Sequence, residues 1–181
     1  MIKNIYFSIF SVIILCMVTL SDLKAQAPVN EKAEAKAFVQ KFYDWYLPLY
    51  NKSIDGKNRT RPSIAALNQR PEYFDEPLRK ALIEDGIAQS KAHEIVGLDY
   101  DPFLAAQDIV FSYKLGDIKQ VGNKLWIEVS VGDHIMVEVM KTGGSWKFTD
   151  FIYPAHVKMK QLSLLQELTY LRNSREKRNT K

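Results

Sequence analysis

The chain has 181 residues, of which 46% are hydrophobic and 25% charged, and its formal net charge is +4. This composition is typical of a globular protein and excludes disordered and fibrous classes. The single cysteine, Cys16, excludes an intramolecular disulfide, so a core must stabilise the fold. About 155 residues remain beyond the N-terminal segment, enough to bury such a core in one domain.

The first 25 residues resemble a secretory signal peptide. Lys3 supplies the positive start, 5–20 form an apolar run, and small residues at Ala25 and Ala27 suit cleavage. Cleavage after Ala25 is preferred because Pro28 follows Ala27. The apolar run is shorter than the ~20 residues of a membrane-spanning helix, which disfavours a retained anchor. We therefore predict a periplasmic or secreted protein with no integral membrane span after cleavage.

A helix is predicted over 31–50, followed by a polar loop over 51–62. The helix carries an aromatic stripe at helical spacing, which favours core packing over a ligand-stacking surface. Pro48 is expected to bend or end it. The loop predicts a surface connection or a flap. The stripe comprises Phe38, Phe42, Trp45, Tyr46 and Leu49.

One or two helical turns are predicted over 63–70 and a second long helix over 76–91. Asp75 is a suitable N-cap for the long helix, and Pro77 favours its first turn. Gly86 weakens the helix interior by about 1 kcal/mol relative to alanine, which indicates a close approach of another helix.

Residues 98–108, here called the hinge stretch, contain three aspartates and Gln107 among apolar residues. Asp99, Asp101 and Asp108 could bind a divalent cation, but the glycine turn and the bidentate carboxylate of calcium loops are missing. The structural alternative is preferred. Asp101 would cap a short helix beginning at Pro102, so that removing its carboxylate costs about 1 kcal/mol, and Asp108 would fix the turn into a strand.

Beyond the hinge stretch the hydrophobic period changes to two. Strands are predicted over 109–115, 125–131, 135–140 and 146–153, with glycine-containing turns between them. A final helix is predicted over 158–172, with a disordered end. Helices followed by antiparallel strands indicate an α+β fold, in which helices pack on a curved, cone-like sheet of about four strands and a C-terminal helix follows.

The chain is thus divided into a signal peptide (1–25), a cone-like α+β domain (30–155) and a basic C-terminal helix and tail (156–181). The last segment has seven basic and two acidic residues. It could contact nucleic acid or anionic lipid, but a solvated helix end is preferred because secretion removes nucleic-acid partners.

Three motifs carry a resemblance to known proteins. The helix 38–46 and the hinge stretch resemble a family of secreted bacterial proteins of unknown function, domain of unknown function 3828. The hairpin Gly143-Gly144-Ser145-Trp146-Lys147 is similar to the last hairpin of the nuclear-transport-factor-2-like (cystatin-like cone) superfamily. The resemblance implies a fold with a pocket. That superfamily includes isomerases, dehydratases and binding modules, so it does not select a function.

Proton-shuttling catalysis would need a carboxylate facing an apolar pocket with neutral donors beside it. Strict strand alternation places Asp150 on the face of Trp146 and Phe148, which makes it the first candidate. Asp99 with Tyr46, Tyr100 or Tyr113 is the second. Glu128 and Glu138 fall on the opposite parity and are expected to be exposed. No histidine has an obvious triad partner, and no zinc or phosphate-loop spacing occurs.

These patterns give three hypotheses. The first is a non-catalytic binding module whose cone pocket takes a small ligand, peptide or envelope protein. The second is an isomerase- or dehydratase-like enzyme with a pocket aspartate as base, and the third is an inhibitor or immunity-like partner of a cell-wall hydrolase. No cofactor, metal or nucleic acid is expected, and a homodimer is left open. The predicted ligand-binding residues are Trp45, Tyr46, Asp99, Tyr100, Asp101, Gln107, Asp108 and Trp126.

Overall fold

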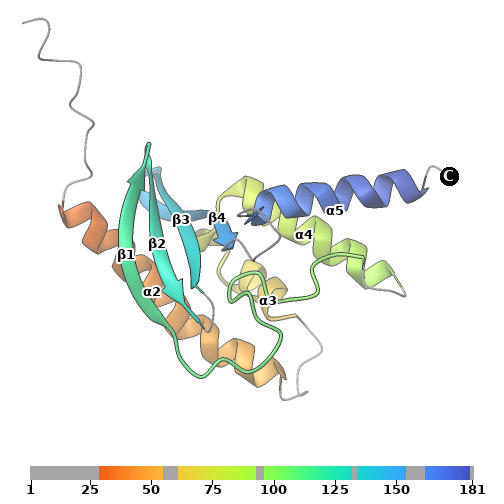
Figure 1. The fold of residues 1–181 in the computed structure, drawn as a ribbon, viewed down its shortest axis with the longest axis horizontal. Helices are drawn as coiled ribbons and strands as arrows, with labels where there is room; N and C mark the ends of the chain where they lie inside the picture. Colours follow the sequence, from red (N-terminus) through yellow and green to blue (C-terminus); the bar gives the residue numbers. More distant parts are fainter. Residues whose placement is uncertain (1–28, 55–60, 93–95, 132–133, 154–161, 180–181) are drawn as a thin grey trace, which may run out of the picture.

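The computed structural model describes residues 29–54, 61–92, 96–131, 134–153 and 162–179. Within these ranges the chain is α+β, as predicted, with N-terminal helices, an antiparallel sheet and a C-terminal helix (Figure 1). The predicted signal peptide and part of the polar loop 51–62 lie outside the described residues.

The N-terminal helices are α2 (Val29–Lys52), α3 (Pro62–Gln69), a short 3-10 helix (Pro71–Tyr73) and α4 (Glu76–Lys91). The predicted cap of α4 is confirmed, since the Leu78 amide donates to Asp75 Oδ1 at 2.9 Å. Pro48 was expected to bend or end the first helix, and it does not end it, because α2 continues to Lys52; the bend stays a prediction. Burial of Leu47 and Tyr50 on either side of Pro48 holds this last turn despite the missing N–H donor.

Four long strands follow: β1 (Lys114–Val121), β2 (Lys124–Ser130), β3 (His134–Thr142) and β4 (Ser145–Tyr153). They pair antiparallel in sequence order, and the two-residue β5 (Leu162–Ser163) extends the sheet beside β4. The C-terminal helix α5 spans Leu164–Asn179, so it begins and ends later than predicted. Residues 173–179, expected to be disordered, are helical, and 180–181 lie outside the described residues.

The first predicted strand is also displaced, because Lys114 is the first residue of β1 and 109–113 lie outside the sheet. Asn51 explains the difference. Its side-chain amide donates to the Val110 carbonyl at 2.7 Å and accepts from the Val110 amide at 3.2 Å, as a neighbouring strand would. The Tyr50 hydroxyl donates to the Asp108 carbonyl at 2.9 Å. This segment therefore runs along α2 and leaves Phe111 89% exposed.

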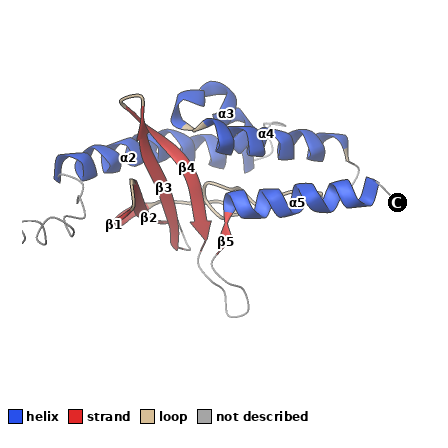
Figure 2. Ribbon diagram, turned by 90° about the horizontal axis from the view of Figure 1, so that it is seen from above, coloured by secondary structure: helices blue, strands red, loops and turns tan. Residues whose placement is uncertain are grey.

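Helix α2 crosses one face of the sheet (Figures 1 and 2), and its aromatic stripe packs in the core as preferred. The Phe42 ring is fully buried and lies 4.8 Å from the Phe148 ring and 5.2 Å from the Tyr46 ring. Aliphatic residues of alternate sheet positions complete the same cluster. They are Leu125, Ile127, Val129, Ile135, Val137 and Val139.

Helices α4 and α5 lie side by side and extend outward from the β4 end of the sheet (Figures 1 and 2), and a buried ion pair joins them. Asp85 Oδ1 accepts from the Arg175 guanidinium at 2.7 Å, and its Oδ2 accepts from the Leu98 amide at 3.2 Å. Gln89 donates to Asp85 Oδ2 at 2.7 Å and to the Leu98 carbonyl at 3.0 Å. The carboxylate of Asp85 thus fixes the start of the hinge stretch against both helices.

Candidate functional site

The hinge stretch forms a tight turn at its centre. The Asp101 amide donates to the Ala106 carbonyl at 2.8 Å, and Asp101 Oδ1 accepts from the Phe103 amide at 3.0 Å and the Leu104 amide at 3.2 Å. Ala105 closes the turn with a φ of 50°. The short helix expected at Pro102 is absent, but the Asp101 carboxylate accepts the two amides that a cap would accept. Asp108 is held through its carbonyl and not, as expected, through its carboxylate.

A buried tyrosine completes the hydrogen bonding of Asp101. The Tyr46 hydroxyl donates to Asp101 Oδ2 at 2.5 Å, and Asp101 is only 8% exposed. Burial raises the pKa of the Asp101 carboxyl to about 6, although the hydrogen bonds from Tyr46 and the two amides oppose that rise. The same burial, with the charge of Asp101, raises the pKa of Tyr46 well above its usual value.

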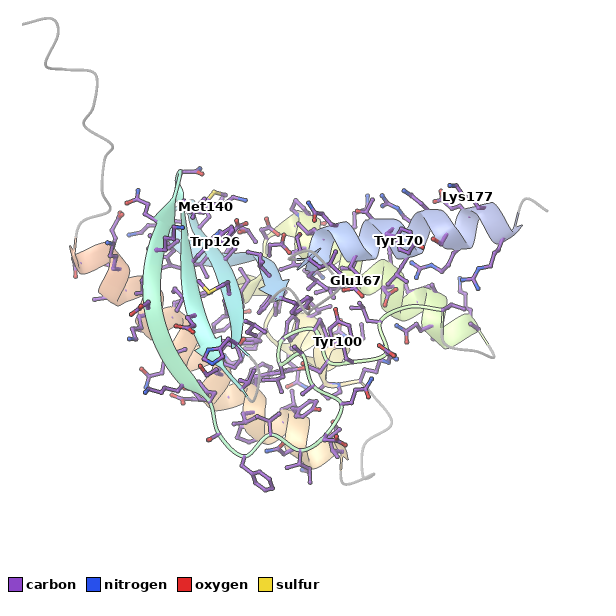
Figure 3. All side chains as sticks on the ribbon, in the orientation of Figure 1. Tyr100, Trp126, Met140, Glu167, Tyr170 and Lys177 are labelled. Carbon is purple, nitrogen blue, oxygen red and sulfur yellow. The ribbon has the colours of Figure 1, made fainter. Side chains whose placement is uncertain are left out.

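A pocket of about 420 Å³ lies over this pair, where the end of α2, the start of α3 and the hinge stretch meet. It brings together four of the residues predicted to bind a ligand: Asp99, Tyr100, Asp101 and Gln107. The Tyr100 hydroxyl donates to Glu167 of α5 at 2.5 Å, and both residues are labelled in Figure 3. The remaining lining residues are Tyr50, Ile54, Arg61, Pro62, Ser63 and Ala106.

The other predicted ligand-binding residues do not line this pocket. Trp45 stacks beneath Arg70, whose guanidinium carbon is 5.4 Å from its ring. Trp126 donates to Glu138 at 2.9 Å on the sheet, and Tyr46 holds Asp101 from below. Sequence reasoning missed Arg61 and Ser63. Pro62 could have signalled them, because a proline in the first turn marks the start of a helix, where backbone N–H donors have no partner within the helix.

Asp150, the first catalytic candidate, lies on the opposite face from the one predicted. A β-bulge in β4 leaves Thr149 without a paired residue on β3. Phe148 therefore pairs with Val139, while Asp150 pairs with Glu138. The extra residue reverses the parity that strict alternation assumes. Asp150 accepts from the Ser163 hydroxyl and from the Leu165 amide at 3.2 Å, which caps the first turn of α5. Burial raises its pKa, and its partners give it a structural role.

The expectation that Glu138 is exposed is wrong. It is 7% exposed, and its carboxylate accepts from Lys124 at 2.7 Å and from Thr149 at 2.7 Å. The bulge supplies the Thr149 hydroxyl, and the long Lys124 and Trp126 side chains of the neighbouring strand cover the carboxylate. The buried Glu138 carboxylate therefore has hydrogen-bond partners from its own sheet.

The three expected Asp99–tyrosine pairs do not form. Tyr46 donates to Asp101, Tyr100 to Glu167, and Tyr113 to Asp44 and the Gln40 carbonyl. Asp99 is exposed at the pocket, and its carbonyl accepts from Gln107 at 3.3 Å. Its carboxylate is therefore available to a ligand, but the hydroxyl of its neighbour Tyr100 is bonded to Glu167 and not to Asp99.

Two further hollows are described. One of about 550 Å³ lies between α3 and α4 and is lined by Ile64, Ile83 and Ile87, and another of about 440 Å³ follows the exposed face of α5 around Tyr170. Across the described ranges, no three histidine, cysteine or acidic side chains are grouped to hold a metal ion. None of the helices in those ranges is long and apolar enough to cross a membrane.

Comparison of the chain with protein-family models, with curated proteins and with solved structures found no match. The resemblance to the family of unknown function and to the cone superfamily therefore stays a prediction.

The raised pKa of Asp101 predicts a pH dependence of stability. Folded Asp101 holds its proton up to about pH 6, whereas an unfolded aspartate releases it near pH 4. Its contribution to the free energy of unfolding should therefore fall, by about 2–3 kcal/mol in total, as pH rises from 4 to 7. Urea unfolding of wild type and Asp101→Asn across this range measures it. The difference in free energy of unfolding between the two proteins should change by that amount between pH 4 and pH 7. If this difference is the same at every pH, the raised pKa of Asp101 is contradicted.

Proposed function

We propose that the protein is a non-catalytic binding module whose ligand site is the hinge pocket, the 420 Å³ cavity lined by α2, α3 and the hinge stretch. One observation carries the proposal. The pocket is lined by polar groups of both charges, and buried hydrogen bonds to neighbouring residues hold these groups in position. Tyr46 and two amides hold Asp101, and Arg61 donates to the Leu98 carbonyl, which also accepts from Gln89. Such preorganised polar groups around a concave site are characteristic of small-molecule binding.

The isomerase- or dehydratase-like alternative has one observation in its favour. Asp101 lines the pocket and its pKa of about 6 suits a general base. Both of its oxygens, however, already accept hydrogen bonds from three donors. These bonds occupy three of the roughly four lone-pair positions of the carboxylate and hold it in the fold, which makes binding without catalysis the better-supported proposal.

The inhibitor-like hypothesis calls for a large exposed apolar patch. The exposed large hydrophobic side chains of the described residues come from the residues just after α2, from α4, from the segment before β1 and from α5. They are Ile54, Ile87, Ile109, Phe111 and Tyr170. This spread over four segments favours the pocket over a single docking surface.

A fragment screen by two-dimensional amide NMR of the purified protein tests the proposal. Fragments that bind should shift the resonances of Ser63, Gln107 and their neighbours, while resonances around Trp126 on the sheet stay unchanged. Gln107→Trp, which fills the pocket mouth from an exposed position, should abolish those shifts without unfolding the protein. If fragments bind only elsewhere, or not at all, the hinge pocket is not a ligand site.

A further inference from the structure

The α3 end of the hinge pocket is an uncapped helix start. Arg61 precedes the eight-residue α3 and gives no side-chain cap, and Pro62 at the first turn has no N–H. The first backbone bond of the helix runs from the Ala65 amide to the Arg61 carbonyl at 3.0 Å. The amides of Ser63 and Ile64 have no acceptor among the residues that the structure describes. A helix start with such amides attracts an anion.

A second, independent observation points to a ligand at this helix start. Ser63 is 8% exposed and lines the pocket, yet its hydroxyl makes no hydrogen bond to any described residue. A hydroxyl that lines the pocket without a partner in the described fold can donate a hydrogen bond to a bound polar group. The Arg61 guanidinium lines the same pocket. One of its nitrogens donates to the Leu98 carbonyl at 3.2 Å, and a guanidinium has further donors to offer.

The hinge-stretch wall of the pocket has the opposite charge. Asp99 presents an exposed carboxylate there, and Asp101 lies at the base with its oxygens engaged by Tyr46 and the turn amides. These two carboxylates disfavour a multiply charged anion such as phosphate. They favour a ligand that brings its own positive group to Asp99.

We propose that the hinge pocket binds a short zwitterionic molecule of dipeptide size. Its carboxylate would accept from the Ser63 hydroxyl, the Ser63 and Ile64 amides and Arg61, and its ammonium group would lie towards Asp99. The size follows from the volume: about 420 Å³ is room for roughly a dozen non-hydrogen atoms at the ~30 Å³ that a water molecule occupies. This inference rests on the proposed binding function and names the class of ligand.

Calorimetric titration with L-alanyl-L-alanine, its C-terminal amide and its N-acetyl derivative tests this. Amidation removes the carboxylate and should weaken binding at least tenfold, and acetylation, which removes the ammonium group, should also weaken it severalfold. An amide that binds as tightly as the free dipeptide, a dipeptide that does not bind, or inorganic phosphate that binds more tightly than the dipeptide would each overturn the proposal.

Ser63→Ala and Arg61→Gln should each weaken dipeptide binding five- to tenfold. Ser63→Ala should keep the wild-type melting temperature, because the hydroxyl makes no hydrogen bond in the described fold. Arg70→Gln is the matched control, since it changes an arginine at the other end of α3 that lies over Trp45 outside the pocket. Equal losses in Arg61→Gln and Arg70→Gln would overturn the anion site.

The two proposals fail in different ways. If fragments of other chemistry shift the pocket amides while the dipeptide and its amide bind equally, the ligand class is wrong and the binding function stands. If no small molecule shifts those amides, both fail.

Discussion

Asp85→Ala is expected to lower the free energy of unfolding by about 3–5 kcal/mol, as is typical when one partner of a buried ion pair is removed. The Asp85 and Arg175 side chains are only 4% and 15% exposed. Without the carboxylate, the Arg175 guanidinium keeps only the Val96 carbonyl at 3.0 Å, and the buried Leu98 amide loses its acceptor. Urea unfolding followed by tryptophan fluorescence measures the loss.

Glu84→Ala is the control for this prediction. Glu84 is the adjacent residue on α4 and contacts Arg172 at 3.5 Å, but both side chains are well exposed. Exposed pairs contribute about 0–1 kcal/mol, so this variant should stay close to wild type. A double-mutant cycle with Asp85→Asn and Arg175→Gln should give a coupling energy well above zero. Additive losses would show that the two side chains act independently.

Asp101→Ala is expected to cost about 2–4 kcal/mol when measured at pH 5, below the raised pKa of the carboxyl. The substitution leaves the Tyr46 hydroxyl and the Phe103 and Leu104 amides without their acceptor inside the core. A buried group left unpaired costs about 1–3 kcal/mol, which makes the loss larger than the ~1 kcal/mol of a simple cap.

Asp101→Asn tests whether the loss of stability comes from the missing hydrogen-bond acceptor or follows from any substitution in this turn. Asparagine keeps an oxygen for the two amides and fits the same space, so most of the lost stability should return in thermal melts at pH 5. If both variants melt with the wild type while ligand binding disappears, Asp101 acts on the ligand and not on the fold.

The helices and strands that depend on local sequence patterns could be predicted from the sequence. Aromatic residues at helical spacing predicted α2, Asp75 and Pro77 predicted the start of α4, and alternation between glycine turns predicted β2, β3 and β4, whereas β1 is displaced. These elements depend on neighbours in the chain, which a single sequence displays. The α+β class followed from their order.

The sequence could not predict contacts between distant residues. Asn51 takes the backbone groups of Val110, 59 residues away, and this shortens the first strand. Thr149 bulges out of β4 and reverses the direction of Asp150, although nothing in the alternation signals it. Arg175 was assigned to a solvated tail, yet it pairs with Asp85 across 90 residues. The hinge pocket depends on such contacts, which is why Arg61 and Ser63 were missed.

The central claim is that the hinge stretch is held by its buried side and binds a ligand with its exposed side. The most direct test is a comparison of L-alanyl-L-alanine affinity and melting temperature in wild type and Gln107→Trp. The account predicts an unchanged melting temperature and loss of binding, because Gln107 is exposed at the pocket mouth. Undiminished binding in the folded Gln107→Trp protein would contradict it.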